Sequence, residues 1–90
     1  MIRTTALLRA AVAHQRAARV HEEASALHAR AAGFFLERHR GGLAQRELQL
    51  AASQTAAAQC ERRLAVADGR RATALTASPR ATLPLRTAEP

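Results

Sequence analysis

The sequence predicts an all-α protein, an antiparallel two-helix hairpin of the coiled-coil kind, which we expect to dimerise into a four-helix bundle. Three consecutive seven-residue blocks, 13–19, 20–26 and 27–33, each open with an apolar residue followed by a histidine. A seven-residue period is typical of a helix that keeps one seam against another helix. Two such seams follow one another along the chain, separated by the pair Gly41-Gly42.

The first helix is expected over about 2–40. Gly33 lies inside it and costs only about 1 kcal/mol relative to alanine, which a long helix tolerates. Residues 41–42 form the predicted turn, because glycine accepts the left-handed backbone angles found at helix C-termini. The seam alternates steps of four and three residues, and all its members are apolar: Ala6, Ala10, Ala13, Ala17, Val20, Ala24, Leu27, Ala31 and Phe34.

The second helix is expected over about 43–68, with Gly69 as its C-terminal cap, so that residues 1–69 form the hairpin. Its seam has the same spacing with more polar members: Leu43, Arg46, Leu50, Ser53, Ala57, Cys60, Leu64 and Ala67. A second stripe is expected to face away from the first helix: Ala44, Leu48, Ala51, Thr55, Ala58 and Ala65. Three prolines then oppose a regular helix, and 70–90 is predicted to be a disordered basic tail: Pro79, Pro84 and Pro90.

Folding the chain about Gly42 aligns the two seams in one register. Six layers then combine apolar or small side chains: Phe34 with Leu50, Ala31 with Ser53, Leu27 with Ala57, Ala24 with Cys60, Val20 with Leu64 and Ala17 with Ala67. We expect the large members to form the buried seam: Val20, Leu27, Phe34, Leu50 and Leu64.

The same register places polar residues opposite one another along the edges of the hairpin. The expected pairs are His14 with Asp68, His21 with Glu61, His28 with Gln54, Phe35 with Glu47, and Glu23 with Arg63. An imidazolium opposite a carboxylate would make a pH-sensitive edge of His14, His21, Asp68 and Glu61. The alternative is that the histidines only decorate a duplicated repeat.

Composition favours association with a partner. The chain has 90 residues, its only aromatic residues are Phe34 and Phe35, and its net charge is +7 with 14 arginines and no lysine. Small chains with few large apolar side chains usually oligomerise or dock. The longer first helix is expected to overhang the second, which leaves Leu7, Leu8 and Val12 to bind a partner. The single cysteine, Cys60, suits a reducing cytoplasm.

We therefore expect a non-enzymatic assembly or protein-binding module that acts through homodimerisation or a helical partner. No catalytic set, cofactor or small-molecule substrate is indicated, and histidines about 10.5 Å apart along a helix cannot share one metal ion. No stretch reaches the about 20 apolar residues of a membrane span. The alternative is a nucleic-acid-binding accessory protein that uses the surplus of positive charge, through Arg9, Arg16, Arg19, Arg70 and Arg71. Residues 1–21, with four arginines and no acid, also have the composition of a mitochondrial transit peptide.

The histidine repeat, Val20-His21-Glu22-Glu23-Ala24 and Leu27-His28-Ala29-Arg30-Ala31-Ala32, resembles small helical proteins of GC-rich actinobacteria, a resemblance that implies no activity. In size and hairpin shape the chain is also similar to the small helical substrates of type VII secretion, the WXG family. It departs from that family at the turn, which reads Arg40-Gly41-Gly42 instead of Trp-x-Gly, and the chain has no tyrosine for the export signal.

Overall fold

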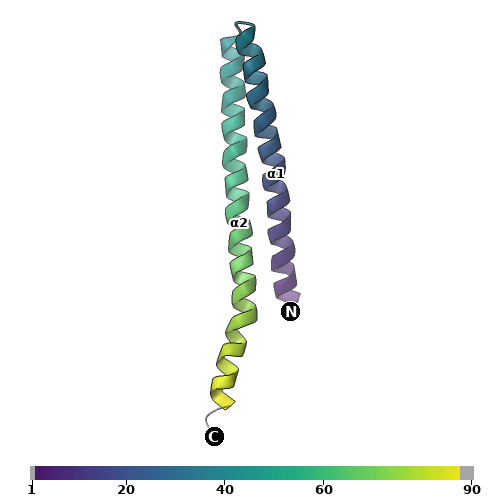
Figure 1. The fold of residues 1–90 in the computed structure, drawn as a ribbon, viewed down its shortest axis with the longest axis vertical. Helices are drawn as coiled ribbons and strands as arrows, with labels where there is room; N and C mark the ends of the chain where they lie inside the picture. Colours follow the sequence, from purple (N-terminus) through teal and green to yellow (C-terminus); the bar gives the residue numbers. More distant parts are fainter. Residues whose placement is uncertain (1, 88–90) are drawn as a thin grey trace.

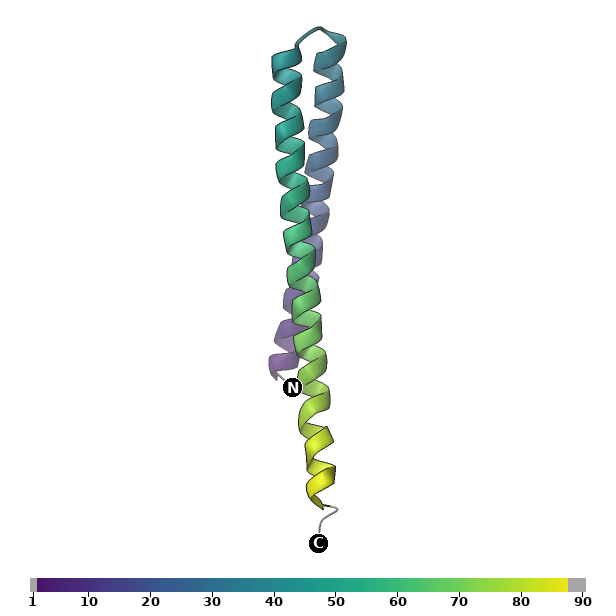
Figure 2. The same cartoon turned by 90° about the vertical axis from the view of Figure 1, so that its left-hand side faces the viewer.

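The computed structural model describes the backbone of residues 2–87 and the side chains of residues 2–77. It is a hairpin of two antiparallel helices, α1 (Ile2–Glu37) and α2 (Gly41–Thr87), joined by one tight turn. Figures 1 and 2 show a thin rod in which the two helices run side by side, with Cα extents of 81 × 18 × 12 Å. The predicted all-α hairpin is confirmed.

The relative length of the two helices is the reverse of the prediction. α1 has 36 residues and α2 has 47, so α2 continues beyond the first residues of α1 (Figure 1). The expected overhang of the first helix is therefore wrong. Leu7 is half-buried and shares a shallow groove with Ala74 and Leu75 of α2.

The turn lies closer to the N-terminus than Gly41-Gly42. The amide of His39 donates to the carbonyl of Leu36 over 3.0 Å, and the amide of Arg40 donates to the carbonyl of Phe35 over 2.8 Å. These two bonds form a Schellman motif, and His39 occupies its left-handed position with φ of 57°. The predicted end of the helix at Arg40 is wrong because this motif closes the helix at Glu37, and both glycines become the first residues of α2.

Replacement of His39 by glycine should stabilise the hairpin by about 1 kcal/mol, because only the left-handed conformation of an L residue is relieved. Urea unfolding followed by circular dichroism measures the gain. Gln45→Gly, at an exposed position inside α2, is the control and should cost about 1 kcal/mol. A loss of stability on His39→Gly would contradict this turn.

The second helix does not end at Gly69. α2 runs through Gly69, and Ala72, one turn further on, is only 3% exposed. A single glycine is tolerated here because buried residues lie on both sides of it along the helix. The predicted tail of 70–90 therefore begins too early, since the described backbone of α2 continues through Thr87. Residues 88–90 of that prediction lie outside the described part.

The contact between the helices is made of small side chains. All buried apolar residues of the described part are alanines: Ala11, Ala18, Ala32, Ala44, Ala51, Ala58, Ala65 and Ala72. Alanine at these positions lets the two backbones approach closely, with little apolar area removed from water per residue. In α2 these alanines recur every seven residues from Ala44 to Ala72, in the stripe that was expected to face away.

The predicted seam is wrong, because its large members are all exposed. Their exposed fractions are 61% for Val20, 59% for Leu27, 49% for Phe34, 39% for Leu50 and 43% for Leu64. The earlier turn rotates and shifts the pairing, so that each helix presents a different row of residues to the other.

Candidate interaction surface

A ladder of three hydrogen-bonded rungs crosses the contact between the helices. His14 donates from Nδ1 to Oε1 of Glu61 over 2.5 Å, His21 donates to Oε1 of Gln54 over 2.6 Å, and His28 donates to Oε1 of Glu47 over 2.7 Å. Because both helices place these residues seven apart, one residue type repeats opposite its complement at every second turn. Layers of alanine alternate with the rungs.

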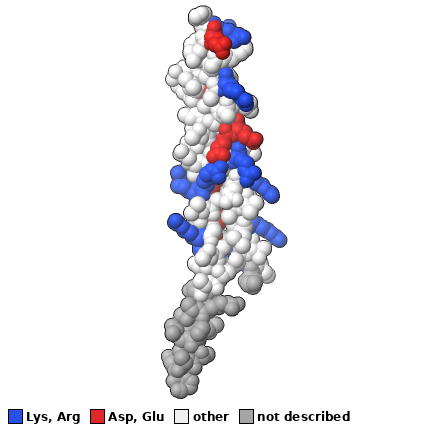
Figure 3. Space-filling model, viewed as in Figure 1, with Lys and Arg blue, Asp and Glu red and all other residues white. Residues whose placement is uncertain are grey.

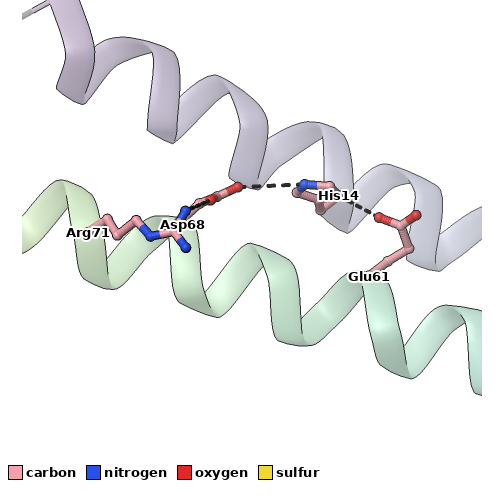
Figure 4. A network of polar contacts seen from close by, with 4 residues as sticks. All are labelled: His14, Glu61, Asp68 and Arg71. Atoms are coloured by element: carbon pink, nitrogen blue, oxygen red, sulfur yellow. Dashed lines mark hydrogen bonds and ion pairs between the residues drawn. The ribbon is translucent and has the colours of Figure 1, made fainter.

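The rung at His14 is the most extended (Figure 4). The imidazole lies between two carboxylates of α2, with Nε2 3.6 Å from Oδ2 of Asp68, while Arg71 approaches the other oxygen of Asp68 at 3.5 Å. Asp68 is the most protected polar residue among residues 2–77, with 9% of its surface exposed. Glu61, His14, Asp68 and Arg71 therefore form one continuous chain of polar contacts between the two helices.

The observed pairs of the rungs differ from the predicted pairs by one heptad. Glu61 contacts His14 rather than His21, and Gln54 contacts His21 rather than His28. Glu47 contacts His28 rather than Phe35. The expected approach of His14 to Asp68 does occur, as the longer contact of the first rung. The expected pair of Glu23 with Arg63 is replaced by its neighbours Glu22 and Arg62.

The ladder satisfies its own polar groups. The side chains of His14, Glu61, His28 and Glu47 are 21–32% exposed. No buried side-chain nitrogen or oxygen of the described residues lacks a hydrogen-bond partner. Ser25 interrupts the alanine row of α1, and its hydroxyl donates to the carbonyl of Ala51 over 3.0 Å. Polar rungs of fixed spacing favour one register of the helices over others. Within the described side chains, no three metal-binding residues come together.

One side of the hairpin is bridged by an ion pair. Arg62 donates from Nε and Nη2 to the two carboxylate oxygens of Glu22, over 3.0 and 2.7 Å. The hydrogen bonds to Arg62 lower the pKa of Glu22 below its ordinary value, and the same bonds raise the pKa of Arg62. Both side chains are about half exposed, so the pair orients the helices more than it stabilises them.

Acidification should remove the contribution of the Glu22–Arg62 pair to stability. Since the folded pKa of Glu22 is lowered, its contribution is present above the unfolded pKa and is lost as pH falls through the folded value. The thermal midpoint of the wild type should therefore drop more than that of Glu22→Gln between about pH 5 and about pH 3. Circular dichroism melts at both pH values measure the difference. Equal drops would show that the pair contributes nothing.

The opposite side carries a surface of mostly apolar and small side chains that we call the apolar face. The Glu22–Arg62 pair shows which flank of α1 and which flank of α2 lie on one side of the hairpin. The other two flanks lie together on the opposite side, where Arg3 and Leu7 of α1 share a groove with Arg71 and Leu75 of α2. The apolar face has four rows, in order from the outer edge of α1 to the outer edge of α2: Ala13, Val20, Leu27 and Phe34; Ala10, Ala17, Ala24 and Ala31; Leu43, Leu50, Ala57 and Leu64; Arg46, Ser53, Cys60 and Ala67.

These rows are the two seams that were expected to pack against each other. The structure instead places them side by side on one face, where neither covers the other. Across these rows Arg46, beside the turn, is the one charged residue. Phe34 closes the face at the same end, with its ring 3.5 Å below the guanidinium carbon of Arg38.

The residues predicted to bind a partner separate in the structure. Leu7 lies against α2, whereas Leu8 is 51% and Val12 is 44% exposed on the outer side of α1. Leu8 and Val12 share a shallow groove with Arg9 and Arg16. Two of the residues expected to bind a protein thus meet two of those expected to bind nucleic acid.

The arginines do not form one continuous band on the face drawn in Figure 3. Blue side chains are scattered along both helices there, and midway along the rod they touch red ones. Arg9, Arg16 and Arg19 are exposed on α1, and Arg70 and Arg71 on α2. Arg71 already contacts Asp68, which reduces its availability to phosphate.

Cys60 is exposed on the outer row of α2. The prediction that it packs on Ala24 inside the hairpin is wrong, because the alanine row of α2 takes that place. A thiol at this position can react with a neighbouring molecule.

Comparison with models of known protein families, with curated proteins and with solved structures finds no match for this chain. In the part of the chain that the structure describes, neither helix is long and apolar enough to cross a membrane.

Proposed function

We propose that this protein is a non-enzymatic assembly module that pairs with a second copy of itself through the apolar face. The observation that carries the proposal is that small apolar side chains are buried between the helices while large ones are exposed. Every buried apolar side chain of the described part is an alanine, while the large residues of the apolar face are 37–61% exposed. Two helices joined mainly through alanine layers and polar rungs gain little from burial, and a second copy would supply the missing apolar contact.

The size of the apolar face supports a dimer. Its six large side chains leave roughly 500 Å² of apolar surface in water, taking about 150–200 Å² for each fully exposed side chain. Such a patch is at the upper end for a monomer. Two copies would bury about 1,000 Å² through these side chains alone, which is the area that a biological interface should reach with good complementarity.

Its lack of charge points in the same direction. Rows that face water in a soluble coiled coil normally carry charged residues, as the Glu22–Arg62 side does. The charged residues of the apolar face are Arg46 and Arg38, which covers the ring of Phe34, and both lie beside the turn, where their long stems can extend along the surface. A homodimer needs no complementary charge on its partner, because the contact is isologous.

Sedimentation equilibrium at micromolar concentration tests the proposal. The wild type should have twice the 9.7 kDa mass of one chain. Leu50→Asp should raise the dissociation constant at least about 100-fold, because each dimer would bury two unpaired carboxylates. A wild-type chain that stays monomeric and fully helical would overturn the proposal.

The control is Leu48→Asp. Leu48 is 46% exposed, close to the 39% of Leu50, and lies two residues away on the same helix. It is on the side of Glu22 and Arg62, outside the apolar face. The dimer should survive this substitution, and equal disruption by both variants would place the contact elsewhere.

A further inference from the structure

The order of side chains across the apolar face specifies how a second copy fits. The outer row of α1 is large at Val20, Leu27 and Phe34, and the inner row is entirely alanine. In α2 the order is reversed, because three of four inner residues are leucine and three of four outer residues are small, the fourth being Arg46 beside the turn. Across the face, the rows therefore run large, small, large, small.

We infer that two copies pack with both turns at the same end, so that α1 of each hairpin lies on α2 of the other. This inference rests on the proposed homodimer. A twofold axis along the rod reverses the order of the rows, so every large row meets a small row of the partner. Interdigitation of large with small side chains gives the close packing of protein interiors.

The other face-to-face arrangement has the turns at opposite ends. It places α1 on α1 and α2 on α2, so that Val20, Leu27 and Phe34 meet the same large row and alanine meets alanine. Large rows would hold the two copies apart while the alanine rows left gaps, and both overpacking and voids are destabilising. Both arrangements make every neighbouring pair of helices antiparallel, as in up-down bundles with short loops, so the order of the rows decides between them.

Cys60 provides a direct probe of this arrangement. Ala13 precedes His14 and Cys60 precedes Glu61, so both lie at the level of the first rung, on the two outer edges of the face. Within one hairpin both inner rows separate them, which prevents an intrachain disulfide. In the inferred dimer, Ala13 of one copy lies against Cys60 of the other.

The experiment is disulfide trapping of the full chain in a glutathione redox buffer. Ala13→Cys should yield at least about ten-fold more covalent dimer than the wild type, because the two thiols are held at high effective concentration. Gln15→Cys is the control, since it has the same height on α1 but lies on the side of Glu22. It should remain at the wild-type level.

A second pair of introduced cysteines tests the same arrangement independently. Val20→Cys with Ser53→Cys, in a Cys60→Ser background, should also crosslink between chains, because these positions face each other in the next layer. If neither pair crosslinks above its control while sedimentation shows a dimer, the arrangement is wrong and the homodimer stands. If sedimentation shows a monomer, the proposed function itself fails.

Discussion

Leucine at position 18 should destabilise the hairpin by about 3 kcal/mol, a large part of the 5–15 kcal/mol that holds a typical domain together. Ala18 is 0% exposed, the most buried residue described, and it sits in the alanine row between the rungs of His14 and His21. Three additional carbons have no space there unless the helices separate. Separation would also stretch the two neighbouring hydrogen-bonded rungs.

Urea unfolding of Ala18→Leu at a fixed protein concentration gives the loss of free energy. Ala26→Leu is the matched control, because Ala26 is exposed on the same helix and leucine has a helix propensity close to that of alanine. It should be neutral within about 0.5 kcal/mol. Equal stability of both variants would mean that the alanine layers do not form the contact. Leu27→Ala, by contrast, should leave the hairpin folded and weaken only the dimer, since Leu27 is 59% exposed.

The sequence is sufficient to predict two long antiparallel helices, because a seven-residue period is a local property of each segment. It is insufficient to decide which row of each helix faces the other. The heptad pattern assigns large residues such as Leu27 and Leu50 to the inner contact, although a chain that associates can reserve them for a second copy. The decisive signal is a second period, in which α2 repeats alanine and an acidic or amide residue every seven positions, matching the histidines of α1.

The turn shows why the predicted register is shifted. Gly41-Gly42 is the strongest stop signal in the sequence, and helices usually place glycine in the left-handed position. Here His39 takes that position, with hydrogen bonds from the turn to Leu36 and Phe35. Histidine is enriched among non-glycine residues with positive φ, but far less than glycine, so the sequence alone favours the wrong residue. A shift of the turn by a few residues is enough to change which row of each helix faces the other.

A substitution in one rung should distinguish the observed register from the one predicted from the sequence. His28→Glu places a second carboxylate against Glu47, in a site where the two original side chains are 32% and 21% exposed. The lost hydrogen bond and the like charge should together cost about 2 kcal/mol at neutral pH. In the register predicted from the sequence, residue 28 would face Gln54 instead, and the same substitution would cost far less.

The double variant His28→Glu with Glu47→His restores one imidazole and one carboxylate in the same rung. It should recover most of the loss, and a double-mutant cycle in urea should give a coupling energy of about 1–2 kcal/mol between positions 28 and 47. The matched cycle pairs His28→Glu with Gln54→His, two positions in different rungs. That cycle should be additive within about 0.5 kcal/mol. Strong coupling to position 54 instead of 47 would support the register predicted from the sequence. In that register the large side chains of the apolar face pack inside the hairpin.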